Sequence, residues 1–282
     1  MQHTTNWTIT NNQGLDIIGN TDHPTTNPHA TLILLHGFKG YKDYGFIPIL
    51  SHALANHGIL THRFNFSTSG MTNNTETFAR PDLFALDTWN RQVEDVHCVI
   101  NAIINKTLPG ANLPLFLCGH SRGGGTALLT AARTPQPNLA GLITINSVDA
   151  CNRMDTESQN AILQTGHTIT QSARTKQDLR INATWLQEQL DDPASHNILS
   201  LCKDITCPTL TIHGNDDQAV PIEAGINITN ALDTTLHTIS GANHVLNTAN
   251  PAPINTHPSP QLGEVIKLLQ SFVDTNSTKT PI

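Results

Sequence analysis

Short runs of apolar residues alternate along the chain with segments in which apolar residues recur every three or four positions. The runs lie at residues 31–37, 58–66, 114–119, 140–146 and 208–214, and a weaker one lies at 234–240. Runs of this length that end at glycine or at polar residues are typical of buried β-strands. The sequence therefore predicts six strands, most of them buried.

Helical spacing occupies the intervals between these runs. The clearest case is the set Trp89, Val93, Val96, Ile100 and Ile103, which are separated by four, three, four and three positions. The ranges 48–56, 124–133, 184–190 and 260–274 are also predicted as helices. Strands that alternate with helices form a mostly parallel sheet with helices on both faces. The carboxyl ends of such strands lie along one edge, where sites in open α/β sheets form.

One segment interrupts the alternation. The stretch from about residue 148 to residue 203 is polar and lies between two predicted strands. We expect one α/β domain over residues 1–282, with this stretch as a small cap-like insertion over the strand ends, and we expect a frayed end at 276–282. A chain of 282 residues fits one large domain of this class or two average domains.

Composition and charge exclude several classes of protein. The chain is 38% hydrophobic and 13% charged, with a net charge of −7, which is globular and gives no attraction to nucleic acid or to an anionic membrane. No signal peptide and no membrane-spanning run is visible. The five cysteines are scattered without a CxxC pair, which is typical of free thiols in a reducing compartment. We therefore expect a cytoplasmic protein that binds neither nucleic acid nor membrane.

A serine stands at the junction between a predicted strand and a predicted helix. Residues 119–123 read Gly-His-Ser-Arg-Gly, directly after the run at 114–119. This is the context of a G-x-S-x-G nucleophile elbow, in which glycines two positions before and after the serine avoid collisions at a sharp turn. Ser121 is thus the candidate nucleophile. A plain glycine-rich turn with an incidental serine is the alternative.

A serine nucleophile needs a histidine base and a carboxylate that orients it. His244 lies in the loop after the last predicted strand, a better position than those of His36, His120 or His257. The acid is expected after the run at 208–214, where Asp216 and Asp217 compete. We prefer Asp217, because the phrase Asp-x-x-Val-Pro places it at the loop apex.

The same chemistry requires backbone donors for an oxyanion. One is the N–H of Arg122, directly after the nucleophile, and the other is expected from Phe38, in the glycine-containing loop after the run at 31–37. The side chain of Arg122 has two interpretations. It either binds an anionic part of the substrate or, as we prefer, pairs with a structural carboxylate such as Glu94 or Asp95.

Together these motifs resemble the α/β-hydrolase superfamily over nearly the whole chain. The matching segments are HGFKGYKD at 36–43, RFNFSTSG at 63–70, GHSRGG at 119–124, HGNDDQAVP at 213–221 and GANHVL at 241–246. The chain is similar to small bacterial hydrolases of the dienelactone-hydrolase-like, serine-aminopeptidase-like and feruloyl-esterase-like group. The resemblance implies an α/β-hydrolase fold, a triad of Ser121, Asp217 and His244, and an oxyanion hole at Phe38 and Arg122. Dienelactone hydrolases use a cysteine nucleophile, so the serine argues against that activity.

The expected function is hydrolysis of a small-molecule carboxylic ester of a small acyl or aromatic acid through an acyl-enzyme. The alternatives are an amidase or peptidase that uses the same triad, and a non-catalytic binding protein that retains the fold. No HExxH spacing and no GxGxxG loop occurs, so we expect neither a metal nor a cofactor.

Overall fold

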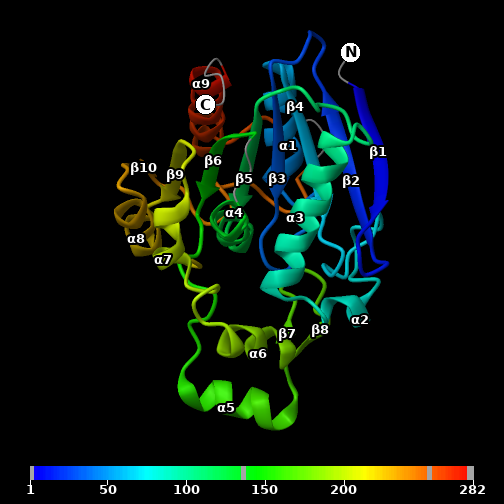
Figure 1. Ribbon diagram of the computed structural model, residues 1–282, viewed down its shortest axis with the longest axis vertical. Helices are drawn as coiled ribbons and strands as arrows, with labels where there is room; N and C mark the ends of the chain where they lie inside the picture. Colours follow the sequence, from blue (N-terminus) through cyan, green and yellow to red (C-terminus); the bar gives the residue numbers. More distant parts are fainter. Residues whose placement is uncertain (1–2, 135–137, 253–255, 278–282) are drawn as a thin grey trace.

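The computed structural model describes residues 3–134, 138–252 and 256–277 and shows one eight-stranded sheet (Figure 1). The strands follow the order β1 (His3–Thr10), β2 (Asp16–His23), β4 (Ile59–Asn65), β3 (Ala30–Leu35), β5 (Leu115–His120), β6 (Leu139–Ile145), β9 (Thr209–Gly214) and β10 (Leu236–Ile239). Pairing is antiparallel between β1 and β2 and between β2 and β4, and parallel across the rest of the sheet. The expectation of a mostly parallel sheet with flanking helices is confirmed.

Helices cover both faces of this sheet, and further helices lie in the segment between β6 and β9. They are α1 (Phe46–Asn56), α2 (Pro81–Phe84), α3 (Trp89–Ile104), α4 (Arg122–Arg133), α5 (Thr156–Thr165), α6 (Thr184–Asp191), α7 (Ile198–Leu201), α8 (Ile222–Leu232) and α9 (Pro260–Ser277), with a short 3₁₀ turn at Cys202–Asp204. Strand β3 shows why its run is uninterrupted: Ile33 and Leu35 pack in the core with α3 and α4, whereas Leu32 and Leu34 pack with α1 and α9. A strand that is covered on both faces has no solvent side for polar residues.

The strongest helical pattern is confirmed at α3. All five of its apolar positions, from Trp89 to Ile103, are buried in the core against the sheet. Thr88 caps the helix by accepting a hydrogen bond from the backbone N–H of Arg91 at 3.3 Å. The other predicted helices and the six predicted strands agree with the structure to within a few residues.

Several elements were not predicted, and the strands among them are polar. Strands β1 and β2 form the antiparallel edge of the sheet and are rich in Thr, Asn and Asp. Trp7 and Ile9 still pack against the core, but two apolar residues in an alternating strand leave too weak a pattern to identify. Helix α9 continues to Ser277, past the start of the expected frayed end, and residues 278–282 lie outside the described residues.

The polar stretch between β6 and β9 has its own small structure. It contains α5, α6, α7 and a separate two-stranded sheet of β7 (His167–Gln171) and β8 (Asp178–Asn182). In Figure 1, α5, α6, β7 and β8 project from one end of the large sheet. Within the described ranges, no helix is long and apolar enough to cross a membrane.

Candidate active site

Ser121 lies at the turn between β5 and α4, and its backbone is in an unusual conformation. Its φ is 55° and its ψ is −123°, a region that residues with side chains rarely adopt. The flanking glycines are required by close packing. A Cβ on Gly119 would lie 2.1 Å from the carbonyl oxygen of Gly123, and a Cβ on Gly123 would lie 2.5 Å from that of His36. The local structure therefore has the features of a nucleophile elbow.

The loop after β3 lies directly against this serine. A Cβ on Gly37 would be 2.9 Å from Cβ of Ser121 and 3.4 Å from its Oγ. His36 holds the loop, because its Nδ1 bonds to the carbonyl oxygen of Gly37 at 2.8 Å and its Nε2 accepts from the N–H of Phe66 at 3.3 Å. Complete burial lowers the pKa of His36 to about 4, so the imidazole is neutral at pH 7.

Two backbone donors next to Ser121 are unoccupied. In the described part of the chain, neither the N–H of Phe38 nor that of Arg122 donates a hydrogen bond to another group. Phe38 belongs to the loop against Ser121, and Arg122 is the first residue of α4. Donors that are left free beside a hydroxyl are what a developing oxyanion requires.

The structure brings Asp217 and His244 together. The Nδ1 atom of His244 lies 2.8 Å from Oδ2 of Asp217. The other carboxylate oxygen of Asp217 accepts hydrogen bonds from the N–H groups of Ala219 and Val220 at 2.8 and 2.9 Å. Burial would raise the pKa of Asp217, but the bonds to His244 and to the two backbone N–H groups outweigh it and lower the pKa. Asp216 is exposed and lies outside this pair.

The pair is linked to the elbow through His120. The ring of His120, the residue before Ser121, lies 4.7 Å from the ring of His244 between centroids. Asn146, directly after β6, also donates a hydrogen bond to the carbonyl oxygen of His244 at 3.0 Å. The loop that carries His244 is thus held against the strand ends next to Ser121.

Arg122 pairs with a different carboxylate from those expected. Its Nη1 lies 3.0 Å from Oδ2 of Asp87, and both side chains are at least nine-tenths buried. Glu94 instead accepts from Gln13, and Asp95 accepts from Asn11 and from the N–H of Ser67. The choice of Glu94 or Asp95 was therefore wrong. Asp87 precedes α3 and lies 35 positions before Arg122 in the sequence. No sequence pattern connects two residues so far apart, so this pairing could not be predicted.

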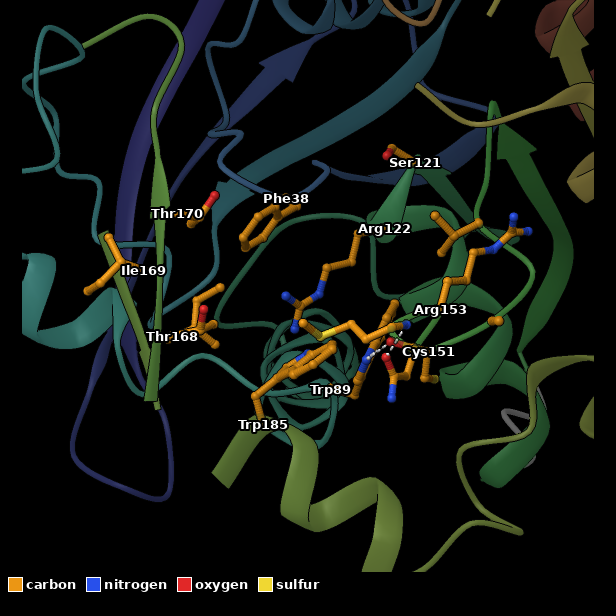
Figure 2. Close-up of a pocket in the computed structure, with 15 residues that line it drawn as sticks. Phe38, Trp89, Ser121, Arg122, Cys151, Arg153, Thr168, Ile169, Thr170 and Trp185 are labelled. Atoms are coloured by element: carbon orange, nitrogen blue, oxygen red, sulfur yellow. Dashed lines mark hydrogen bonds between the residues drawn. The ribbon is translucent and has the colours of Figure 1, made fainter. Parts of the chain in front are cut away.

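A cavity of about 440 Å³ opens beside Ser121. Three aromatic side chains line it, those of Phe38, Trp89 and Trp185 (Figure 2). Ile169, Thr168 and Thr170 close it on the side of β7. In the insertion, Trp185 lines the cavity and its neighbour Leu186 is buried. The contribution of Trp89 was missed, because its helical spacing identifies it only as a core residue.

In the residues that the structure describes, no group of three or more His, Cys, Asp or Glu side chains could hold a metal ion. All five cysteines are free thiols.

Comparison with known proteins identifies the family. The sequence profile described as "Serine aminopeptidase, S33" matches residues 26–190, more than half of the chain. A search of curated protein sequences finds no match. Many solved structures are similar, although their low sequence identity makes this a likeness of fold alone.

Three of these structures are esterases or hydrolases by name. The esterase domain of a Rhodothermus marinus protein is 21% identical, with a TM-score of 0.67 over 98% of this chain and 99% of that one. Est1E from Butyrivibrio proteoclasticus with ferulic acid bound is 18% identical, with a TM-score of 0.70 over 97% and 100%. The α/β hydrolase GrgF from Penicillium sp. sh18 is 16% identical, with a TM-score of 0.74 over 98% and 100%. The chain therefore belongs to the serine aminopeptidase S33 family and is a hydrolase of the α/β-hydrolase superfamily.

Proposed function

We propose that the protein is a serine esterase in which Ser121 attacks the carbonyl carbon of a carboxylic ester. The main support is the hydrogen bond between Asp217 and His244, in loops at the sheet edge where Ser121 occupies its strained turn. A binding protein without catalysis has no need of an oriented and paired histidine at this place. The alternative of a non-catalytic relative is therefore disfavoured.

The proposed mechanism gives each group one role. His244 accepts the proton of Ser121 as the hydroxyl attacks, and it later donates this proton to the departing alcohol. Asp217 holds Nδ1–H of His244 and stabilises the imidazolium. The N–H groups of Phe38 and Arg122 bind the oxyanion of the tetrahedral intermediate. Water then hydrolyses the acyl-enzyme by the same steps.

The cavity beside Ser121 is the proposed site of the acyl group. A volume of about 440 Å³ is within the range of small-molecule pockets, and the aromatic rings of Phe38, Trp89 and Trp185 favour a flat or apolar acid. The similar structure of Est1E has ferulic acid bound, an aromatic acid of this size class. We propose that the insertion at about 148–203 acts as a cap, because it supplies most of the remaining wall.

The alcohol part of the ester is proposed to lie on the opposite side of Phe38. A second cavity, of about 680 Å³, shares Phe38 with the first and is bordered by Val245, the residue after His244. The leaving oxygen must lie beside His244 to receive its proton, so this side suits the alcohol.

The lining of the first cavity argues against the activity in the family name. An aminopeptidase holds the positive α-amino group of its substrate, which requires a carboxylate near the nucleophile. In the described residues, the charged side chains that line the cavity are Arg122 and Arg153, and none is acidic. We therefore prefer ester hydrolysis of a small molecule, and we propose a reducing compartment, the cytoplasm, where the free thiols persist.

The test is hydrolysis of p-nitrophenyl esters of increasing acyl length by the wild type and by Ser121→Ala. We expect turnover of short or aromatic acyl esters and a loss of at least about a thousandfold in the variant. A fluorophosphonate should label the wild type at Ser121 and leave the variant unlabelled. Background rates with both proteins and no label on the wild type would contradict the proposal. Matched amides, measured in parallel, decide between ester and amide cleavage.

A further inference from the structure

Only one of the three nitrogen atoms of the Arg122 guanidinium has a partner among the described residues. Its Nη1 pairs with Asp87, whose carboxylate also accepts hydrogen bonds from Thr68 at 2.8 Å and from Gln92 at 3.1 Å. Within the described chain, Nε and Nη2 of Arg122 have no hydrogen-bond partner, and they have almost no exposed surface. A buried donor without a partner costs about 1–3 kcal/mol, so two on one side chain call for an explanation.

The two unpaired donors lie on one edge of the guanidinium plane. The N–H groups of Nε and Nη2 point in the same direction, and this spacing matches the two oxygens of a carboxylate. Asp87 contacts the group at Nη1 and leaves that edge free. The free edge is therefore shaped for a second, bidentate carboxylate, and no such partner is found for it among the described residues.

Arg122 belongs to the wall of the proposed acyl cavity, and its free edge lies beneath that wall with almost no exposed surface. Arg122 lines this cavity, and Figure 2 shows its guanidinium extending between Phe38 and Trp89. The guanidinium carbon lies 4.6 Å from the ring centroid of Trp89 and 5.6 Å from that of Phe38. The indole N–H of Trp185, which also lines the cavity, is buried and has no hydrogen-bond partner among the described residues.

The charges around the cavity favour an anion. Arg153 lines it and pairs with Asp149. Lys39 lines the second cavity, and its Nζ bonds to Thr170, which lines the first, and to the carbonyl oxygen of Gln171, both neutral acceptors. The described lining contains no acidic side chain, because the carboxylates of Asp87 and Asp149 lie behind the arginines with which they pair.

We propose that the substrate is an ester whose acyl group carries a free carboxylate, which binds Nε and Nη2 of Arg122. This inference rests on the proposed esterase function and adds the substrate class. The acyl group must be short, because Arg122 follows Ser121 directly and its side chain sets the maximum separation. The ring of Phe38, which is 38% exposed and lies over the guanidinium, swings aside to admit the carboxylate.

The first test needs no variant. Half-esters of p-nitrophenol with glutarate, adipate and terephthalate are compared with esters in which the free carboxylate is a carboxamide. We expect the carboxylate ester to have a kcat/KM at least about tenfold higher for one of these acids. If kcat/KM of the carboxylate ester were equal to or lower than that of the carboxamide ester for all three acids, the inference would be overturned. A water molecule trapped on the free edge of Arg122 would give this result.

The second test assigns the preference to a side chain. Arg122→Lys keeps the backbone N–H and the charge but loses the two-donor edge, so the ratio of the two rates should fall to about one. Arg153→Lys is the matched control and should keep the ratio of the wild type. A ratio that falls in Arg153→Lys and not in Arg122→Lys would overturn the assignment. Because both esters are measured with the same protein, a general loss of activity lowers both rates and leaves their ratio unchanged.

Binding separates a failure of this inference from a failure of the proposed function. Calorimetry with Ser121→Ala should detect the p-nitrophenyl half-ester of terephthalate and should find its carboxamide counterpart, which has no free carboxylate, at least about tenfold weaker. Turnover of both esters without a preference overturns the carboxylate site and leaves the esterase standing. Absence of turnover and of fluorophosphonate labelling overturns the esterase, and equal binding of the two probes overturns the carboxylate site.

Discussion

The imidazole of His120 donates a hydrogen bond from Nε2 to the carbonyl oxygen of His244 at 2.7 Å. A carbonyl oxygen only accepts, so Nε2 carries a proton. Complete burial lowers the pKa of His120 to about 3, which keeps the ring neutral in the working range of most enzymes. The residue before the proposed nucleophile thus fixes the backbone of the proposed base.

His120→Phe should slow catalysis without weakening substrate binding. Phenylalanine retains a ring against His244 but cannot donate to its carbonyl oxygen, so the loop of His244 loses one anchor. A small displacement of a catalytic group is costly, and we expect kcat to fall by roughly ten- to a hundredfold with KM nearly unchanged. His237→Phe, at an exposed position on β10, is the control. A raised KM with unchanged kcat would show that His120 acts on binding instead.

The adjacent aspartates should differ sharply. Asp217→Asn leaves the shape of the site but replaces the acceptor for Nδ1–H of His244, so kcat should drop by about a thousandfold or more. Asp216→Asn alters an exposed side chain and should change kcat by less than about twofold. Steady-state kinetics with a p-nitrophenyl ester provides both values. Similar losses in the two variants would contradict the role of Asp217.

The buried half of the fold could be predicted from the sequence, because strands covered on both faces require uninterrupted apolar runs. Strand β3 has such a run, because Ile33 and Leu35 pack in the core on one face of the sheet and Leu32 and Leu34 pack in the core on the other. The edge strand β1 packs on one face only, through Trp7 and Ile9, so its sequence contains no apolar run. The apolar pattern of the sequence therefore predicts a strand more clearly when more of that strand is buried.

The candidate site divides along similar lines. Ser121, Asp217 and His244 could be located because each follows a predicted strand and parallel strands end at one edge. The ion pair of Arg122 with Asp87 could not be predicted, because it joins the first residue of α4 to the loop before α3, which only the packing of α3 against α4 brings together. The cavity also depends on the folding of a polar insertion, whose weak pattern hides the contribution of Trp185.

The glycines of the chain should respond in opposite ways to substitution by alanine. A Cβ on Gly119 would collide with backbone atoms of Gly123 and Gly124, neither of which can move aside. Gly119→Ala should therefore lower the free energy of unfolding by about 3 kcal/mol or more. Gly263 lies inside α9 with nothing within 4 Å of its would-be Cβ, so Gly263→Ala should raise it by about 0.5–1 kcal/mol. Urea denaturation measures both, and equal effects would contradict the packing argument.

A buried histidine far from the catalytic edge should make stability depend on pH. His62 lies in β4, where its Nδ1 is 2.9 Å from the hydroxyl of Thr21 and its Nε2 is 3.1 Å from the carbonyl oxygen of Pro109. Complete burial lowers the pKa of His62 from 6.5 to about 4. Between these two pH values His62 is protonated in the unfolded chain and neutral in the folded chain. The free energy of unfolding therefore falls as the pH falls.

The size of this effect follows from one proton per molecule. His62 should contribute a slope of about 1.4 kcal/mol per pH unit between pH 6.5 and pH 4. His62→Gln can retain both hydrogen bonds without titrating, so its free energy of unfolding should depend on pH less steeply by that amount. Asp95, whose pKa burial raises to about 6, contributes the opposite slope, but equally in both proteins. Urea unfolding at half-unit steps of pH measures the difference, with the exposed His237→Gln as control. Parallel curves for the wild type and His62→Gln would show that His62 is protonated in the folded protein.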